Sequence, residues 1–187
     1  MPGQLEFQVG PCKGIDIGDH LWMARYLLGR VAEDFKISVS YDPKMFKHFA
    51  GSGGHLNFST KSLREKGGLE LLKSYMEKLS KKHTMHLELY GDNSKRLSGE
   101  FETSKKDTFT WGFGDRGASV RIPTVSIQND YKTYIEDRRP ASDIDPYVVG
   151  ALMIDTLVID GPSKMEELYL TYQKWQAWRK DADIPQA

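Results

Sequence analysis

Charged and metal-capable side chains recur at alternate positions in four short stretches of the sequence. They are Glu6 and Gln8; His55, Asn57 and Ser59; Ser119 and Arg121; and Tyr134, Glu136 and Arg138. Glutamate oxygens and imidazole nitrogens are ligands for Mg²⁺ or Mn²⁺, and an arginine guanidinium presents a fixed fork of donors to phosphate or carboxylate. If one sheet gathers these faces, they line a metal and phosphate site. The alternative is the ordinary solvated face of an antiparallel sheet.

Five stretches alternate apolar and polar residues, which is the pattern of a strand with one buried face. They cover residues 5–9, 37–41, 55–59, 118–122 and 134–138. In the third stretch, Leu56 and Phe58 are expected to face the core. This leaves His55, Asn57 and Ser59 together on the opposite face.

Apolar residues at three- and four-residue steps predict the helices that pack on this sheet. The predicted helices cover residues 19–35, 69–79 and 146–159, and a last one follows Ser163. Asp19 is the expected N-cap of the first helix, and Ser163 with Glu166 forms a capping box. The polar stretch 91–111 predicts a long loop, and such loops are often functional.

The composition is that of an ordinary globular protein. The 187 residues carry 26 basic and 26 acidic side chains and are 39% apolar. A balanced charge gives no broad attraction for nucleic acid or an anionic membrane, and no apolar run reaches the ~20 residues that cross a bilayer. The single cysteine, Cys12, fits a reducing compartment. We expect one cytoplasmic α+β domain, with an antiparallel sheet lining a cleft and helices packed behind it.

Several stretches of the sequence resemble, in unbroken order, the C-terminal half of the catalytic domain of eukaryotic-type glutamine synthetase. They read EFQVGPCKGIDIGDHLWMARYLLGRVAEDF at 6–35, HLNFSTKSLRE at 55–65, KRLSGEFETS at 95–104, DRGASVRIP at 115–123 and YIEDRRPASDIDPY at 134–147. The resemblance spans about residues 1–160 and leaves 161–187 as a C-terminal helical extension. It implies a partial glutamine synthetase catalytic domain.

The resemblance implies an enzyme that condenses glutamate with ammonia, using ATP and Mg²⁺ or Mn²⁺, through a γ-glutamyl phosphate intermediate. It also implies a homo-oligomer, or association with full-length subunits. Three further metal carboxylates of the family have no counterpart in this sequence. The chain is therefore expected to be incomplete by itself and weakly active or inactive.

Carried over motif by motif, the resemblance assigns roles to individual residues. The implied metal ligands are Glu6, His55 and Glu136. The implied ATP contacts are Gly10, Asn57, Ser59, Arg116, Arg121 and Tyr134, with Arg116 also at the transferring phosphoryl group. The implied contacts of glutamate or the intermediate are Gly51, Arg96 and Arg138. Glu102 matches a flap carboxylate that takes a proton from ammonium. For Gly10 and Tyr134 a structural role stays open.

The segment before His55 departs from the family pattern. Ala50 stands where the family has an asparagine that contacts glutamate, and residues 45–49 replace a segment with proline, glycine and tryptophan. Phe101 replaces a histidine beside the flap glutamate. These departures favour a second hypothesis, a non-catalytic glutamine synthetase-like protein with an assembly or regulatory role. The retained site residues favour the enzyme.

Overall fold

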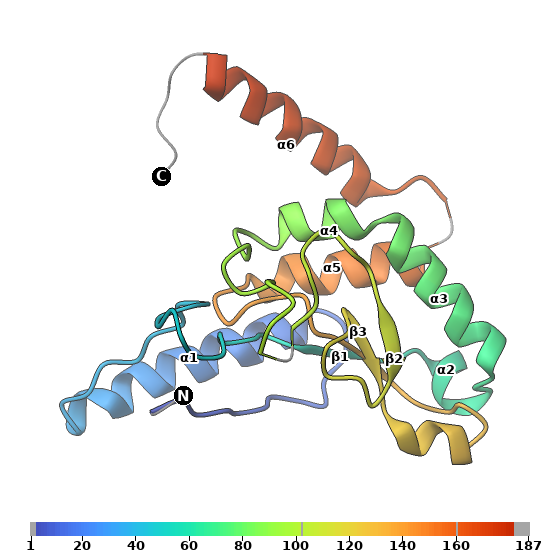
Figure 1. Cartoon of the computed structure of the whole chain (residues 1–187), viewed down its shortest axis with the longest axis horizontal. Helices are drawn as coiled ribbons and strands as arrows, with labels where there is room; N and C mark the ends of the chain where they lie inside the picture. The colour runs from blue at the N-terminus through green and yellow to red at the C-terminus, as the bar shows by residue number, and fades with distance from the viewer. Residues whose placement is uncertain (1–2, 102, 160, 182–187) are drawn as a thin grey trace.

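The chain folds into six α-helices and a four-stranded sheet within the residues that the computed structural model describes, 3–101, 103–159 and 161–181. In order, the elements are α1 (Asp16–Asp34), β1 (Leu56–Phe58), α2 (Lys61–Glu65), α3 (Leu69–Lys81), α4 (His83–Leu89), β2 (Trp111–Phe113), β3 (Val120–Ile122), the 3-10 helix η1 (Thr124–Gln128), β4 (Ile135–Asp137), α5 (Pro146–Leu157) and α6 (Lys164–Asp181). Figure 1 shows α6 extending away from the other elements.

The sheet has the strand order β1-β4-β3-β2, so the expected α+β class is confirmed. The pairs β1/β4 and β3/β4 are antiparallel, as expected, but β2 and β3 run parallel. The prediction of a wholly antiparallel sheet is therefore wrong for this pair. The chain returns along the sheet within residues 114–119, where Gly114 adopts a φ of +66° that favours glycine.

One face of the sheet forms the hydrophobic core with α3, α4 and α5. Leu56, Val120, Ile122 and Ile135 point into it, and each is almost completely buried. The helices contribute Leu72, Tyr75, Met76 and Leu79 from α3, Met85 and Leu87 from α4, and Val149, Leu152, Met153 and Leu157 from α5. Because side chains alternate along a strand, Asn57, Arg121 and Glu136 point to the other face.

The four predicted helices are confirmed in α1, α3, α5 and α6. Helix α1 begins earlier than expected, at Asp16 with Ile15 as its N-cap, so the N-cap prediction for Asp19 is wrong. At the start of α6, Glu166 N donates to Ser163 Oγ over 3.0 Å, which is the hydrogen bond expected of the cap. The short elements α2, α4 and β2 were not predicted, because five to seven residues or fewer carry too little periodicity.

Two predicted strands are absent from the described structure. Residues 5–9 and 37–41 have no regular secondary structure, and Leu5 is 92% exposed. Alternation specifies which side chains share a face, but a strand also needs a neighbouring strand to pair with. No strand of the described ranges lies in register with either segment. The third, fourth and fifth predicted strands are confirmed as β1, β3 and β4. The described residues of 91–110 form a loop with one isolated bridge among them, Ser98 with Lys105.

Candidate active site

Glu136 lies at the centre of a row of polar side chains across the sheet. The strand register places Asn57 of β1 on one side of it and Arg121 of β3 on the other. The sequence pattern predicted that one sheet gathers these faces, and for these strands it does. The side chain of Glu136 is 7% exposed, so its charge needs partners.

Three basic side chains supply those partners. Arg138 Nη1 lies 3.0 Å from Glu136 Oε1, and His55 Nδ1 lies 3.1 Å from the same oxygen. Arg121 forms an ion pair with Oε2. Burial alone would raise the pKa of Glu136, but the hydrogen bond from His55 and the charge of Arg138 more than offset it, and the pKa lies below the usual range. Glu136 is therefore ionised at neutral pH.

Arg96 fixes the tautomer of His55. Arg96 Nη2 lies 3.0 Å from His55 Nε2, and a guanidinium can only donate. Nε2 must then accept, which leaves the ring proton on Nδ1, where it is donated to Glu136. Burial, aided by the charges of Arg138 and Arg96, lowers the pKa of His55, so the imidazole is neutral at pH 7.

Arg96 itself is buried in the structure rather than open to a substrate. It is 4% exposed, and its guanidinium donates to the carbonyls of Arg138 over 2.9 Å and Arg139 over 3.3 Å. Burial is the main cause that lowers its pKa to about 10, at which it still carries its charge at neutral pH. Arg96 thus ties the loop 91–110 to the end of β4.

Two glycines make room for this arginine. A Cβ on Gly53 would lie 2.3 Å from His55 Nε2 and 2.7 Å from Arg96 Nη2, and a Cβ on Gly51 would lie 2.9 Å from Arg96 Cγ. Gly51 and Arg96 were both predicted at the glutamate side of the site, and they are neighbours in the structure. Sequence reasoning missed Gly53, whose requirement follows from a contact made only in three dimensions.

A buried ionic network holds the other side of β4 in place. Asp137 and Arg139 are 0% exposed and form a two-point contact, with Nε to Oδ1 and Nη2 to Oδ2 both at 2.8 Å. Arg139 Nη2 also lies 3.0 Å from His86 Nδ1 of α4, and Tyr90 donates to Asp137 Oδ2 over 2.9 Å. No pattern in the sequence predicts this network. It fixes the strand from which Glu136 and Arg138 project.

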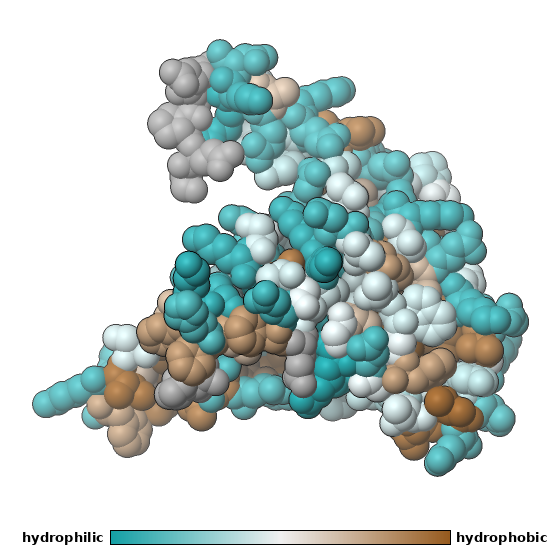
Figure 2. Space-filling model, in the orientation of Figure 1, coloured by the Kyte–Doolittle hydropathy of each residue, from teal (hydrophilic) through white to brown (hydrophobic). Residues whose placement is uncertain are grey.

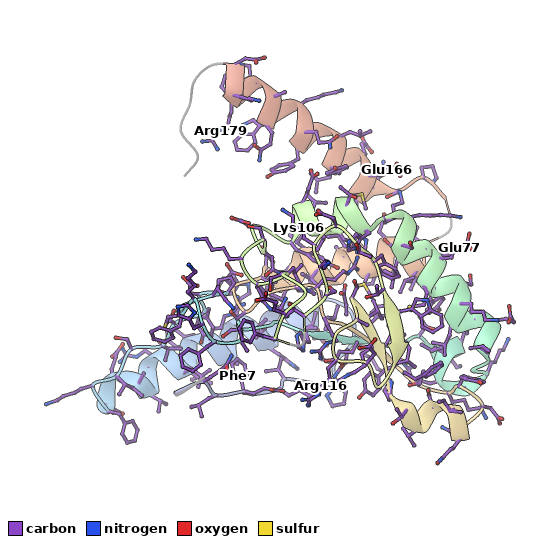
Figure 3. The ribbon with its side chains drawn as sticks, in the orientation of Figure 1. Phe7, Glu77, Lys106, Arg116, Glu166 and Arg179 are labelled. Carbon is purple, nitrogen blue, oxygen red and sulfur yellow. The ribbon has the colours of Figure 1, made fainter. Side chains whose placement is uncertain are left out.

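The expected nucleotide contacts are partly gathered beside this cluster. Arg121 and Tyr134 line one open pocket of about 220 Å³ together with residues of the β2–β3 turn and η1. Arg116 is exposed on the β2–β3 turn, and its carbonyl accepts from Arg138 Nε over 3.2 Å. Figure 3 shows Arg116 at the edge of the sheet, on the side of the N-terminal segment that carries Phe7.

Other residues named from the sequence lie apart or are already engaged. Ser59 Oγ donates to the carbonyl of Thr133 over 2.9 Å, so its hydroxyl holds the backbone. Glu6 and Gly10 are exposed on the N-terminal segment and are not among the side chains that pair with Glu136. Glu102 lies outside the described residues.

Two of the three expected metal ligands, His55 and Glu136, lie side by side. Glu136 Oε2 is buried and accepts no hydrogen bond from the described residues, although Arg121 pairs with it. A carboxylate and an imidazole nitrogen are ligands for Mg²⁺ or Mn²⁺, but Nδ1 of His55 carries a proton and Nε2 accepts from Arg96, so the pair would hold a cation only after Nδ1 gives up the proton that it donates to Glu136. Across the described residues, however, no cluster of three or more His, Cys, Asp or Glu side chains is placed to hold a metal.

Comparisons with known proteins agree on one family. Residues 1–87 match the family model described as glutamine synthetase, catalytic domain. A glutamine synthetase of Agaricus bisporus is 51% identical over 162 residues, which are 86% of this chain and 46% of that protein. One of Saccharomyces cerevisiae is 52% identical over 159 residues, 84% of this chain and 43% of that protein. The chain spans about half the length of the curated relatives it matches.

A solved structure supports the fold. The cryo-EM structure of Plasmodium falciparum glutamine synthetase matches 74% of this chain and 29% of that one, with a TM-score of 0.58 and 22% sequence identity. At this identity the likeness concerns the fold alone. Separately, none of the helices in the described part of the chain is both long and apolar enough to cross a membrane.

Proposed function

Because the chain belongs to the glutamine synthetase family, we propose that it carries the phosphate side and part of the cation side of a glutamine synthetase active site. The reaction of that site is the ATP-dependent condensation of glutamate and ammonia to glutamine through γ-glutamyl phosphate. The observation that carries the proposal is the cluster of Glu136, His55, Arg121 and Arg138 on one face of the sheet.

The arginines of this cluster suit phosphoryl transfer. Such a reaction is accelerated mainly by positioning the reactants and by fixed positive charge at the phosphoryl oxygens. Arg121 and Tyr134 line the pocket beside the sheet, and we assign them to ATP together with Asn57. Arg116 is assigned to the phosphate groups, and Arg138, which holds the Arg116 carbonyl, to the glutamyl side.

The cation side rests on His55 and Glu136. A bound Mg²⁺ or Mn²⁺ would neutralise charge on the ATP phosphates. Arg96 occupies Nε2 of His55, so a cation would bind at Nδ1 in place of the proton that Nδ1 donates to Glu136. Further ligands must come from water or from groups outside the described residues. Glu6 stays a candidate for this role, and so does Glu102 for the ammonium proton.

Two features favour limited activity for this chain by itself. The described residues bring together only two of the expected ligands, and the carboxylate among them is already neutralised by arginines. Arg96, expected at glutamate, is buried against backbone carbonyls. We propose that turnover needs association with further copies or with full-length subunits in the cytoplasm. A purely regulatory or assembly role is the second candidate, favoured by the altered segment 45–54.

Calorimetry of Mn²⁺ and ATP binding tests the assignment. The chain is titrated with ATP in the presence of Mn²⁺, and Arg116→Ala is compared with Arg30→Ala, which removes an exposed arginine paired to Glu33 on α1. We expect Arg116→Ala to weaken ATP binding roughly tenfold, because the phosphates lose a charged donor. Arg30→Ala should bind as the wild type does. Equal ATP affinity in all three chains would contradict the assignment.

A further inference from the structure

Helix α6 is a surface element that the proposed active site does not explain. It follows the segment that resembles glutamine synthetase, and none of its described residues is buried. Its first turn is fixed to the body, because Asp155 Oδ1 accepts from Lys164 N over 3.1 Å and Glu166 pairs with Lys82. Met165 and Tyr169 also pack against the core, and beyond Tyr169 the helix projects from the molecule (Figure 1).

One face of α6 carries an apolar and aromatic stripe. Leu168, Tyr172, Trp175 and Arg179 follow one another at steps of four, three and four residues, which is the repeat of a helix that packs against another helix. The rings of Tyr172 and Trp175 lie 6.0 Å apart, and the Arg179 guanidinium lies 4.8 Å over the Trp175 ring. Leu168 is 52% and Trp175 45% exposed.

The residue types in this stripe are those that dominate protein interfaces. Tyrosine, tryptophan and arginine supply large contact areas and account for much of the binding energy at such surfaces. Stacking of Tyr172, Trp175 and Arg179 along the helix also orders these side chains before any partner arrives. The stripe therefore fits a partner helix that presents apolar side chains at the same spacing.

The charges of α6 show which partner helix fits. Glu166 and Glu167 lie in its first turn, and Arg179 and Lys180 in its last. Two copies of α6 that pack antiparallel bring the acidic end of each to the basic end of the other, and their helix dipoles also oppose favourably. Parallel packing would instead set like charges together.

A membrane surface fits α6 less well than a second helix. Helices that lie on anionic membranes carry mainly basic residues on their polar face. In α6, four basic residues, Lys164, Lys174, Arg179 and Lys180, are accompanied by Glu166, Glu167 and Asp181.

We propose that the α6 stripe is a self-association surface, through which two copies of this chain pair in antiparallel orientation. The midpoint of the pairing lies between Tyr172 and Trp175, so Leu168 of one copy faces Arg179 of the other. The proposal does not depend on the glutamine synthetase activity. The α6 stripe lies outside the segment that resembles glutamine synthetase, so this pairing would not follow from the family resemblance.

Sedimentation equilibrium over a concentration series tests the surface. The wild type should shift from monomer to dimer, and Trp175→Glu and Leu168→Glu should remain monomers. The matched control is Leu170→Glu, which alters a leucine that is equally 52% exposed but lies on the opposite face of α6. It should dimerise as the wild type does. Since no described α6 residue is buried, circular dichroism should show the same folded core in every variant.

Disulfide trapping tests the orientation. In a Cys12→Ser background, chains with Leu168→Cys or Arg179→Cys are oxidised separately and as a mixture. Cross-linked dimers in the mixture only would support antiparallel pairing, whereas cross-linking of Leu168→Cys by itself would overturn it.

In the sedimentation experiment, a wild-type monomer at all concentrations would overturn the proposal, as would association that persists in Trp175→Glu. So would a monomer that binds phosphatidylserine vesicles through the stripe.

Discussion

At the scale of single residues, Glu136 supplies the negative charge that balances the basic side chains of the site. Its carboxylate is almost fully buried, and Arg121, Arg138 and His55 surround it. Arg96 adds a further positive charge behind His55. Without the carboxylate, these basic groups would repel one another in a poorly solvated place.

The exchange of Glu136 for its neutral isostere tests this balance. We expect Glu136→Gln to lower the free energy of unfolding by about 2–3 kcal/mol, because it leaves buried positive charges without a counter-ion. Urea denaturation measures the change. The control Glu70→Gln removes an exposed carboxylate of α3 that pairs with Lys73 and should change stability by less than about 0.5 kcal/mol. A Glu136→Gln chain as stable as the wild type would show that the cluster is not balanced as described.

The sequence could place Glu136, Arg121 and Asn57 on one face, because strand alternation is a local property. It could not show that Arg96 is buried, since this arginine belongs to a loop whose path depends on contacts with the end of β4. The need for Gly53 arises from the same contact. Residue types and spacing thus indicated the kind of site, and tertiary packing determined which side chains are open to a ligand.

At the scale of elements, buried polar side chains join β4 to α4. His86 accepts from Arg139, contacts Thr156 Oγ1 over 2.8 Å, and is completely buried. Burial, followed by the charge of Arg139, lowers its pKa to about 3. The folded protein therefore keeps this ring neutral.

Because His86 stays neutral in the folded state, we expect the free energy of unfolding to fall in mild acid. An unfolded histidine titrates near pH 6.5, so below that pH the unfolded chain binds a proton that folded His86 refuses until about pH 3. Stability is fully present above pH 6.5 and falls as the pH decreases. Between pH 6.5 and 4.5, the free energy of unfolding of His86→Gln should fall less steeply with decreasing pH than that of the wild type. The difference between the two slopes should be up to about 1.4 kcal/mol per pH unit. His20→Gln, which removes an exposed histidine of α1, is the matched control. Equal slopes in all chains would refute the role of His86.

The helices depend on packing against the sheet. Leu79 of α3 is 0% exposed in the core. Leu79→Ala should lower the free energy of unfolding by about 2–5 kcal/mol, because it removes buried methyl groups and leaves a cavity. Chemical denaturation gives the value, and Leu170→Ala on exposed α6 should cost far less. A cost below about 1 kcal/mol for Leu79→Ala would place α3 outside the core.

Helices were easier to predict than strands for a physical reason. A helix closes its own hydrogen bonds, so its three- and four-residue periodicity located α1, α3, α5 and α6. A strand takes its hydrogen bonds from a neighbour, and for residues 5–9 and 37–41 the described chain offers none. The parallel pairing of β2 with β3 likewise depends on the path of the turn between them rather than on either strand.

At the scale of the whole molecule, large apolar side chains remain exposed outside the sheet. In α1, Met23 is 56% and Tyr26 62% exposed, and Phe35 at the end of this helix is 72% exposed. Leu5 of the N-terminal segment is exposed as well. Figure 2 shows apolar residues gathered at the end of the molecule where α1 and the following loop lie. Exposed apolar patches are typical of interaction surfaces. We expect a full-length subunit, rather than a second copy of this chain, to cover this surface.

We propose that this chain holds part of a glutamine synthetase site and binds the ligands of that site without completing the reaction. The most direct test is ATP-dependent glutamine formation by the purified 187-residue chain, beside its Glu136→Ala variant. We expect weak binding of Mn²⁺ with ATP, lost in the variant, and little or no glutamine from either, because the described residues bring together only two of the expected cation ligands and phosphoryl transfer depends on positioning. Robust glutamine formation that Glu136→Ala abolishes would contradict this proposal and show that the chain builds a complete site.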